Sequence, residues 1–409
     1  MDKITLCMLA PEFFPIWGGT GSYTIELLKS LPKFVDVHVV TLKRKIQGGY
    51  FEDFSGAEIN SILNREIKIH YLSKSEDTFF YNLPFQLACL RKIPRLHKEY
   101  RFDIIHSHLC HMPDVLLKFV SKNDIPTVVT VHGTIQMLRE HALLARSMFG
   151  NLEAGEKSIL QFYPFVKILQ SSYAKRVNRL IAVSKATFKL ALEHLGVEKD
   201  RISLVYNGVD TKLFTLPTRN QIKKKYSTPT VVYIGRLISK KGINLLIDAI
   251  PRVLNSHPET RFIFVGGGNI PAYKEILLKK GVSPKNFSFI GHIGYFDRAN
   301  ILKEATVFVN PSFFENCSIS ILEAMSCGCA VIACNVGGNP EIVKNGVNGI
   351  LVPAFDVKSL AKSINLLLED PEYNMHIGFA ARQSVEDNFS LEILSRETLK
   401  VYEQVLMES

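Results

Sequence analysis

The sequence predicts an α/β protein built from two doubly wound parallel sheets, on three observations. Short apolar, β-branched segments alternate with segments of helical periodicity along the whole 409-residue chain. Most of the apolar segments lack an alternation of apolar and polar residues, which is typical of strands buried on both faces. The length also exceeds what one ordinary core uses and favours two domains.

The expected strands form two series. The first series is 4–10, 35–42, 67–72, 102–105, 127–131, 180–183 and 202–205, and the second is 231–237, 261–265, 287–290, 306–309, 330–334 and 349–352. The clearest helical segments between them are 20–31, 243–255, 272–280 and 357–368. Strands that alternate with helices predict parallel sheets covered by helices.

Residues 208–229 separate the two series. This stretch is polar, with two prolines and a basic run, which suits an interdomain connection. We therefore expect an N-terminal domain over 1–213 and a C-terminal domain over 214–388. Residues 389–409 predict an amphipathic helix, N-capped by Ser390, that packs back on the body. Two such lobes face a deep cleft, where ligands bind beyond the carboxyl ends of the strands.

The composition excludes several classes of protein. The chain has 49 Lys and Arg against 39 Asp and Glu, a net charge of +10, which favours an anionic partner. The basic residues are dispersed and no nucleic-acid motif is present, so nucleic acid is not expected. An odd number of cysteines, seven, suits a reducing compartment. With no signal peptide and no apolar stretch near the ~20 residues of a membrane span, we expect a cytoplasmic protein.

Two loops predict phosphate binding. Gly18 and Gly19 lie between the first strand and a helix, where bare backbone amides can bind phosphate. The spacing does not fit a dinucleotide fingerprint, so NAD is disfavoured, and a turn that serves only chain geometry is an equal alternative. Arg236 and Lys241 flank a later strand-to-helix turn and could clamp a pyrophosphate. Two solvated surface cations are the alternative.

Glu315 and Glu323 are the sharpest pair. The segment around them predicts strand, loop, helix and strand, with Glu315 in the loop and Glu323 about two turns into the helix. Two helical turns take ~7.2 residues, so an eight-residue separation predicts similar azimuths. Both carboxylates could then bind hydroxyls of one extended ligand, with the amides of 316–318 between them. Helix capping and surface charge are the alternative.

Histidines follow two of the expected strands. His132 ends the strand 127–131 and could donate a hydrogen bond to a substrate oxygen, or it could be a core histidine satisfied by backbone. His106, His108 and His111 raise the question of a metal. No carboxylate completes a ligand set, and Cys110 is expected to point elsewhere, so we predict no metal site.

Taken together, these segments resemble glycosyltransferase family 4, also called glycosyl transferases group 1, of the GT-B fold. The similarity is strongest over 202–353, where Glu315 and Glu323 fit the family's E-x7-E motif and GGNPEIVKNGVNGILVP follows. The N-terminal half matches through GGTGSYTIELLKSL, FDIIHSH and TVVTVHGT. The order and spacing of these pieces across the chain carry the resemblance.

The resemblance implies a role for each site residue. Gly18 and Gly19 would cradle the donor diphosphate, opposite Arg236 and Lys241. Glu323 would hold the ribose hydroxyls, Glu315 would contact the donor sugar, and His132 would face the sugar ring. Many relatives have glycines after the first Glu. Here the side chains that narrow or re-aim the sugar pocket are Asn316, Cys317 and Ser318.

The function that the resemblance implies is a retaining hexosyltransferase in polysaccharide, glycolipid or glycan assembly. It would move a sugar from a nucleoside-diphosphate sugar to an acceptor hydroxyl, with no metal or other cofactor. A sugar-nucleotide epimerase or phosphorylase on the same scaffold remains an alternative. A non-catalytic nucleotide-sugar-binding protein is a third, which the four intact polar residues of the donor site disfavour.

Two segments of the N-terminal half mix apolar and basic residues. They are 79–102 and the long insertion 133–179. Such helices either pack on the N-terminal sheet or lie in an anionic membrane interface. The resemblance gives the acceptor to the N-terminal lobe, and a lipid-linked saccharide would need a membrane-facing surface. We therefore expect a cytoplasmic protein that binds peripherally and reversibly to the inner membrane face.

Overall fold

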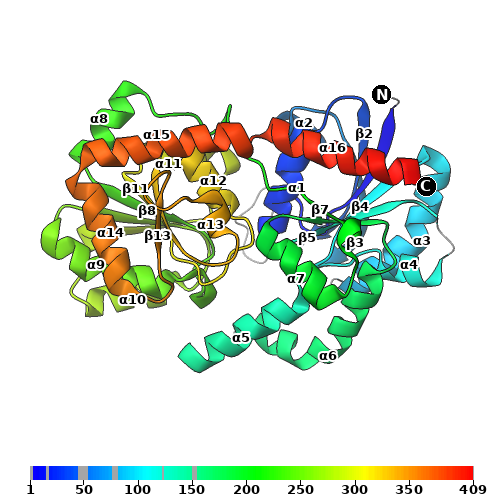
Figure 1. Ribbon diagram of the computed structural model, residues 1–409, viewed down its shortest axis with the longest axis horizontal. Helices are drawn as coiled ribbons and strands as arrows, with labels where there is room; N and C mark the ends of the chain where they lie inside the picture. Colours follow the sequence, from blue (N-terminus) through cyan, green and yellow to red (C-terminus); the bar gives the residue numbers. More distant parts are fainter. Residues whose placement is uncertain are drawn as a thin grey trace. The chain divides into compact units, whose positions relative to one another are not determined.

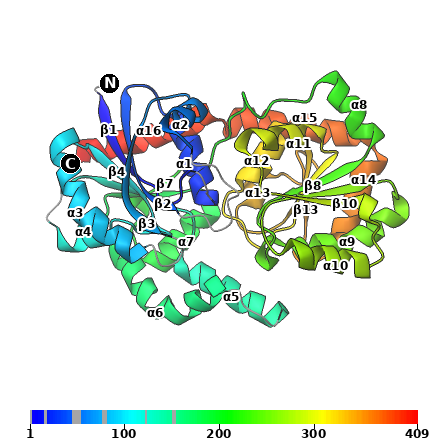
Figure 2. The ribbon, with the colours of Figure 1, turned by 180° about the vertical axis from the view of Figure 1, so that it is seen from behind.

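The computed structural model describes residues 3–14, 18–44, 54–75, 82–121, 124–149 and 154–408 (Figure 1). The chain folds into two compact units. Unit 1 comprises Met1–Gly208 and Leu391–Ser409, and unit 2 comprises Val209–Ser390. Each is an α/β unit with helices on both sides of one sheet, as the turned view also shows (Figure 2). The predicted fold class is confirmed.

The sheet of unit 1 has seven parallel strands in the order β3-β2-β1-β4-β5-β6-β7. Every segment of the first predicted series forms one of them. Their bounds are β1 Ile4–Leu9, β2 Val35–Arg44, β3 Lys68–Ser75, β4 Ile104–His108, β5 Thr127–Val131, β6 Arg179–Ala182 and β7 Ile202–Leu204.

The helices of unit 1 connect these strands and close over the sheet. They are α1 Gly19–Ser30, α2 Gly56–Leu63, α3 Asn82–Tyr100, α4 Val115–Val120, α5 Ile135–Phe149, α6 Ala154–Ala174, α7 Lys185–Leu195 and, from the end of the chain, α16 Leu391–Glu408. The buried face of α3 carries Phe85, Cys89 and Ile93, which pack with strand residues such as Ile105 in one core cluster. The segment expected at 79–102 therefore packs on the sheet, although residues 79–81 lie outside the described residues.

Unit 2 repeats the strand order with six parallel strands, β10-β9-β8-β11-β12-β13. The strands are β8 Thr230–Ile234, β9 Arg261–Val265, β10 Phe287–Gly291, β11 Val307–Asn310, β12 Ala330–Cys334 and β13 Ile350–Val352. The helices are α8 Arg219–Ser227, α9 Ile243–Ser256, α10 Ile270–Lys279, α11 Tyr295–Glu304, α12 Ile319–Ser326, α13 Asn339–Ile342, α14 Val357–Glu369 and α15 Pro371–Asn388.

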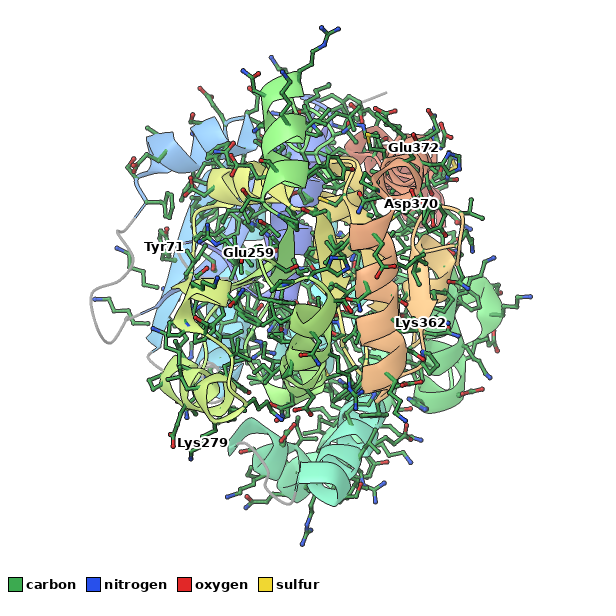
Figure 3. All side chains as sticks on the ribbon, turned by 90° about the vertical axis from the view of Figure 1, so that its left-hand side faces the viewer. Tyr71, Glu259, Lys279, Lys362, Asp370 and Glu372 are labelled. Carbon is green, nitrogen blue, oxygen red and sulfur yellow. The ribbon has the colours of Figure 1, made fainter. Side chains whose placement is uncertain are left out.

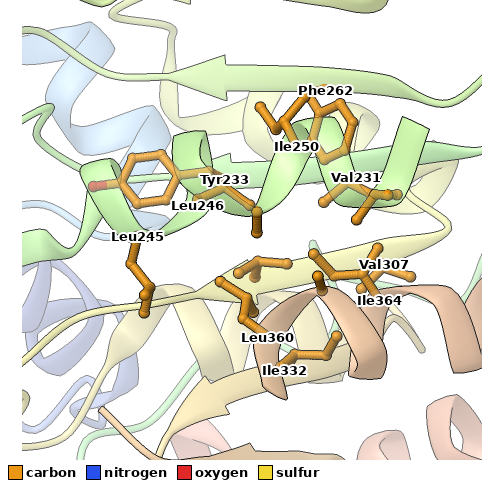
Figure 4. Packing of buried hydrophobic residues seen from close by; sticks show 14 of the residues in the cluster. Val231, Tyr233, Leu245, Leu246, Ile250, Phe262, Val307, Ile332, Leu360 and Ile364 are labelled. Atoms are coloured by element: carbon orange, nitrogen blue, oxygen red, sulfur yellow. The ribbon is translucent and has the colours of Figure 1, made fainter. Parts of the chain in front are cut away.

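The core of unit 2 lies between its sheet and the helices α9 and α14. Val231, Phe262 and Val307 of the sheet meet Ile250 and Ile364 of the helices, and all are buried (Figure 4). Charged side chains such as Glu259, Lys279 and Lys362 extend from the surface of the same unit (Figure 3). This separation follows from burial of apolar area, worth ~25 cal/mol per Å².

The polar stretch 208–229 is only partly a connection. The chain passes between the units after Gly208 and again after Ser390, and the backbone N–H of Val209 donates to the carbonyl of Phe389 at 2.9 Å. Residues 219–227 of the stretch form α8 of unit 2, because Lys225 buries its stem and its carbonyl accepts from Thr306 Oγ1. Phe214 is buried against Tyr295 within unit 2.

Both sheets reverse their winding at a central pair of strands. The order turns between β1 and β4 in unit 1 and between β8 and β11 in unit 2. The loops beyond the carboxyl ends of such strands diverge and leave room for a ligand. Gly18 and Cys110 follow β1 and β4, whereas Arg236 and Glu315 follow β8 and β11.

Candidate functional site

Lys241 and Glu315 meet beyond the carboxyl ends of β8 and β11. Lys241 ends the short 3-10 turn Ser239–Lys241, and its Nζ donates to Oε1 of Glu315 at 2.6 Å. Ser312 Oγ and Asn310 Nδ2 donate to the same oxygen at 2.9 and 3.4 Å. Glu315 Oε2 accepts no hydrogen bond from the described residues. All three hydrogen bonds thus fix the carboxylate through Oε1, and Oε2 is left to accept from a ligand.

Two glycines, which the sequence analysis did not identify, let the backbone pack closely next to this pair. Gly242 has φ 69°, and a Cβ there would lie 1.8 Å from the carbonyl oxygen of Pro311. Gly337 has φ 52°, and a Cβ there would lie 1.9 Å from the carbonyl oxygen of Glu315. Each position excludes a side chain on both counts. The signal in the sequence was a glycine directly after Lys241 and a Gly-Gly pair after β12.

Arg236 leaves its guanidinium without a partner in the described part of the chain. The residue is exposed, two positions beyond β8. Its backbone is held because the Tyr233 hydroxyl donates to the Arg236 carbonyl at 2.7 Å. A cation that is anchored at its backbone and unpaired at its side chain suits an anionic ligand.

Glu323 is fully buried on α12 and faces α11. Arg298 Nη1 lies 2.7 Å from Glu323 Oε1, yet neither carboxylate oxygen accepts a hydrogen bond from the described residues. Burial raises the pKa of Glu323, and the charge of Arg298 opposes that rise only in part. A buried carboxylate that lacks hydrogen bonds is costly, so a function at this position is indicated.

The predicted placement of Glu323 was wrong. Helix α12 begins at Ile319, so Glu323 is its fifth residue, little more than one turn in. Glu315 lies in the loop, as predicted, and binds Lys241, while Glu323 faces Arg298 on another helix. The predicted azimuths do not apply, because residues 315–318 precede the helix and are not helical.

The three residues after Glu315 turn mainly inward. Cys317 and Ser318 are buried, and Asn316 is half-buried. Asn310 Nδ2 donates to Ser318 Oγ at 3.2 Å, which connects β11 to the N-cap of α12. The Cys317 and Ser318 side chains therefore belong to the packing of the loop.

The glycine turn of unit 1 already binds a carboxylate. The Gly18 amide donates to Oε2 of Glu12 at 3.1 Å, while a Cβ at Gly19 would meet nothing within 4 Å. Gly18 is the N-cap of α1 and Gly19 its first residue. The turn binds a negative charge, as expected for a helix N-terminus.

His132 is half-buried directly after β5, at the top of a buried polar network. Its Nε2 lies 3.2 Å from His108 Nδ1, and His108 Nε2 lies 3.1 Å from Thr24 Oγ1. The Tyr23 ring packs edge-on at 4.7 Å. Burial, together with the charge of His111, lowers the pKa of His132 to about 3, although the charge of Glu12 opposes the shift. His132 is therefore a neutral imidazole whose ring contacts the side chains of His108 and Tyr23.

His106, within β4, and His111, three residues after it, have different partners. His106 bonds Thr130 Oγ1 at 2.7 Å and the Tyr402 hydroxyl of α16 at 2.6 Å. His111 instead contacts Cys110, whose Sγ lies 3.2 Å from His111 Nδ1. The expectation that Cys110 points elsewhere was wrong, because the turn after β4 brings neighbouring side chains together. The described residues include no group of three or more His, Cys, Asp or Glu placed to hold a metal ion.

The structure thus brings together Lys241 and Glu315, with Arg236 on the neighbouring strand end, within unit 2. Gly18, Gly19 and His132 follow strands of unit 1. Sequence reasoning missed Arg298, which no motif marked.

Two glycosyltransferase family models match the chain, one in each half. A family model for Glycosyltransferase Family 4 matches residues 17–213, and one for Glycosyl transferases group 1 matches residues 216–384. An uncharacterized glycosyltransferase of Methanocaldococcus jannaschii is 27% identical over 319 residues, covering 75% of this chain and 76% of the relative. A glycogen synthase of Mycobacterium tuberculosis is 25% identical over 341 residues, covering 81% of this chain and 77% of the relative.

Solved structures share the fold across both units. HepE of Anabaena, solved with UDP-glucose, has a TM-score of 0.76 at 20% identity, covering 98% of this chain and 100% of that one. Sucrose-phosphate synthase of Thermosynechococcus elongatus has a TM-score of 0.78 at 20% identity, covering 99% and 100%. With the two family models covering both halves, the chain belongs to glycosyltransferase family 4 and is a group 1 glycosyltransferase of the GT-B fold.

Proposed function

We propose that this glycosyltransferase is a retaining hexosyltransferase that moves a sugar from a nucleoside-diphosphate sugar to an acceptor hydroxyl. The observation that carries the proposal is the Lys241–Glu315 contact of 2.6 Å at the point where the sheet of unit 2 reverses. Arg236, whose guanidinium has no partner among the described residues, follows the same strand as Lys241. One cluster then offers cations for a diphosphate and a carboxylate oxygen for a sugar hydroxyl. A relative in fold, HepE, was solved with UDP-glucose, which supports a donor of this class.

The cations act on the leaving group. Breaking the anomeric C–O bond leaves negative charge on the diphosphate, and Arg236 and Lys241 stabilise that charge as it develops. Preorganised stabilisation of this kind is worth ~3–4 kcal/mol for one donor. Gly19, the first residue of α1, adds a backbone amide with the same preference for an anion, and no atom lies within 4 Å of where its Cβ would be.

The carboxylates select the donor. Glu315 Oε2 accepts from a sugar hydroxyl, while Oε1 stays bound to Lys241. Glu323 accepts from the two ribose hydroxyls, which supply the hydrogen bonds that its buried oxygens lack. Arg298 holds the carboxylate from the other side at 2.7 Å.

The reaction needs no protein nucleophile in this proposal. The acceptor hydroxyl attacks the oxocarbenium-like sugar from the side that the diphosphate leaves, and a phosphate oxygen takes the proton. Glu315 is engaged by Lys241 and positions the sugar. His132, a neutral imidazole, donates to the sugar or accepts from it. No metal is required, because the two cations neutralise the diphosphate.

Three measurements test the proposal. A thermal-shift panel of UDP-, GDP-, ADP- and dTDP-sugars identifies the donor, since a ligand at 100 times its Kd stabilises by ~2.7 kcal/mol. With that donor, the anomeric configuration of the product, read by NMR, should match the donor's, and inversion would refute retention. Free nucleoside diphosphate should accumulate faster when acceptor is added. Conversion of the sugar nucleotide without acceptor would favour an epimerase.

Calorimetry separates the two carboxylates. Glu315→Gln should weaken binding of the nucleotide sugar at least tenfold and leave the bare nucleoside diphosphate nearly unchanged. Glu323→Gln should weaken both ligands. The same pattern in both variants would contradict the assigned roles.

The acceptor proposed for unit 1 is a saccharide linked to a lipid, with α6 at an anionic membrane surface. Phe162, Phe165 and Ile168 recur every three residues along α6 and are 45%, 68% and 70% exposed, among exposed basic residues such as Lys157 and Lys167. Apolar side chains interleaved with lysines suit insertion into anionic headgroups. No described helix is both long and apolar enough to cross a bilayer.

Liposome co-sedimentation tests the membrane surface. Wild-type protein should sediment with vesicles that contain phosphatidylglycerol, and added salt should release it. Phe165→Asp should reduce the bound fraction severalfold, while Phe379→Asp, at a 56% exposed position on α15 of unit 2, should not. Equal recovery with anionic and neutral vesicles at low salt would refute the proposal and favour a soluble acceptor.

A further inference from the structure

Cys110 differs from the other cysteines of the chain. All seven are free and within the described residues, and six are buried, whereas Cys110 is partly exposed. It lies two residues beyond β4, at the strand pair where the sheet of unit 1 reverses. A thiol at that edge is open to solutes, while the other six are shielded by the core.

Cys110 is the first member of a chain of three ionisable groups. Its Sγ lies 3.2 Å from Nδ1 of His111, and Nε2 of His111 lies 3.6 Å from Oε1 of Glu12. Glu12 is fixed in turn, because its Oε2 accepts the Gly18 amide at 3.1 Å. The imidazole thus stands between a thiol and an oriented carboxylate, the arrangement that activates a nucleophilic sulfur.

The charges around the imidazole favour its protonated form. Burial alone lowers the pKa of His111, but the charges of Cys110 and Glu12 outweigh it and raise the pKa to about 10. Neighbouring His108 and His132 stay neutral, since burial lowers their pKa values well below the ordinary range.

The first turn of α1 favours the thiolate. Thr20 Oγ1 lies 3.6 Å from Cys110 Sγ, and Thr20 is the second residue of this 12-residue helix. A helix N-terminus and an adjacent imidazolium both stabilise a cysteine thiolate.

We propose that Cys110, His111 and Glu12 form a thiolate–imidazolium–carboxylate triad that makes Cys110 a site of covalent modification by hydroperoxides. The sulfur attacks one peroxide oxygen, so that an S–O bond forms and the O–O bond breaks. The departing hydroxide takes the proton of the His111 imidazolium and leaves as water. Cysteine is oxidised to sulfenic acid and hydrogen peroxide is reduced.

Modification would add an oxygen beside Thr20, in the first turn of α1. On the function proposed above, this is where the donor diphosphate binds backbone amides, so oxidised protein should bind donor more weakly. The triad itself rests only on the geometry of Cys110 and its partners, and the test separates the two claims.

The test treats the full-length protein at pH 7 with limiting iodoacetamide, or with hydrogen peroxide and dimedone, and identifies labelled peptides by mass spectrometry. An ordinary thiol is only ~3% thiolate at pH 7. Because His111 and the first turn of α1 stabilise the attacking sulfur, we expect Cys110 to be labelled about tenfold faster than glutathione in the same solution. Labelling no faster than glutathione would overturn the proposal, whatever the variants do.

Variants identify the source of the reactivity. His111→Gln and Glu12→Gln should each slow the labelling of Cys110 toward the glutathione rate. His376→Gln, at an exposed position in unit 2, should leave it unchanged. Fast labelling that survives in a folded His111→Gln protein would refute the triad. A saturating amount of the nucleoside diphosphate whose sugar the thermal-shift panel identifies as the donor should slow the labelling of wild type. Fast labelling that this nucleotide does not change would contradict the proposed diphosphate placement while the triad stands.

Discussion

Replacing Lys241 with methionine removes one charge of the Lys241–Glu315 pair and keeps the apolar stem. At 2.6 Å and an effective dielectric constant of ~20, the Coulomb attraction is about 6 kcal/mol before desolvation. The side chains are 28% and 11% exposed, so desolvation and screening offset much of it. Because Ser312 and Asn310 still donate to the carboxylate, we expect Lys241→Met to lower the free energy of unfolding by about 2 kcal/mol.

The effect on turnover should be larger than the effect on stability and independent of it. If Lys241 stabilises the leaving diphosphate, its loss should lower kcat by about a hundredfold or more. The double variant Lys241→Met/Glu315→Gln removes both charges, so it should recover most of the lost stability. It should not recover turnover, because neither the cation nor the sugar-binding carboxylate is restored.

The assay combines urea unfolding with steady-state kinetics on the donor found by thermal shift. A coupling free energy of 1–3 kcal/mol in the double-mutant cycle is expected. Wild-type kcat in Lys241→Met would refute the catalytic assignment. Wild-type stability in both single variants would show that the 2.6 Å contact contributes nothing to folding.

Three further predictions follow from the geometry. Arg236→Ala should lower kcat about a hundredfold without moving the urea midpoint, since its guanidinium binds no described residue, and the exposed Arg252→Ala serves as the control. Arg298→Ala should weaken binding of the bare nucleoside diphosphate, measured by calorimetry, because Glu323 loses the cation 2.7 Å away; unchanged affinity would contradict its positioning role. Burial lowers the pKa of His106 from 6.5 to about 3. The contribution of neutral His106 to the free energy of unfolding is therefore fully present above pH 6.5 and should be lost as the pH falls toward 3. Urea midpoints between pH 7 and 4 check this sign, and a midpoint that rises on acidification would refute it.

The sequence was sufficient to predict the fold, because strands buried on both faces are short, continuous apolar segments that can be recognised locally. All thirteen predicted strands lie in the described sheets, and runs such as 127–131 match β5 in full. Helix patterns were less complete, since α8, RNQIKKKYS, is polar and basic apart from two residues and resembles part of the interdomain connection.

The sequence indicated which residues belong to the candidate site, but it did not indicate which side chains contact each other. The sequence indicated Arg236, Lys241 and Glu315, because they follow the carboxyl ends of expected parallel strands, where ligands bind. The contact between Lys241 and Glu315 joins positions 74 residues apart, and only the pairing of β8 with β11 brings them together. Glu323 was misplaced on its helix because the sequence did not show where α12 begins.

The sequence by itself determined two parallel-sheet domains, the family, and the residues with chemistry to offer. The tertiary structure alone decided which charges are paired and which are not. Arg236 has no side-chain partner among the described residues, whereas Lys241 contacts Glu315, although both follow the same strand. His111 is joined to Glu12 by the pairing of β1 with β4, across 99 positions of sequence. Strand patterns are local, so sequence specifies them directly, whereas side-chain pairing depends on sheet order and loop conformation, which only the assembled chain fixes.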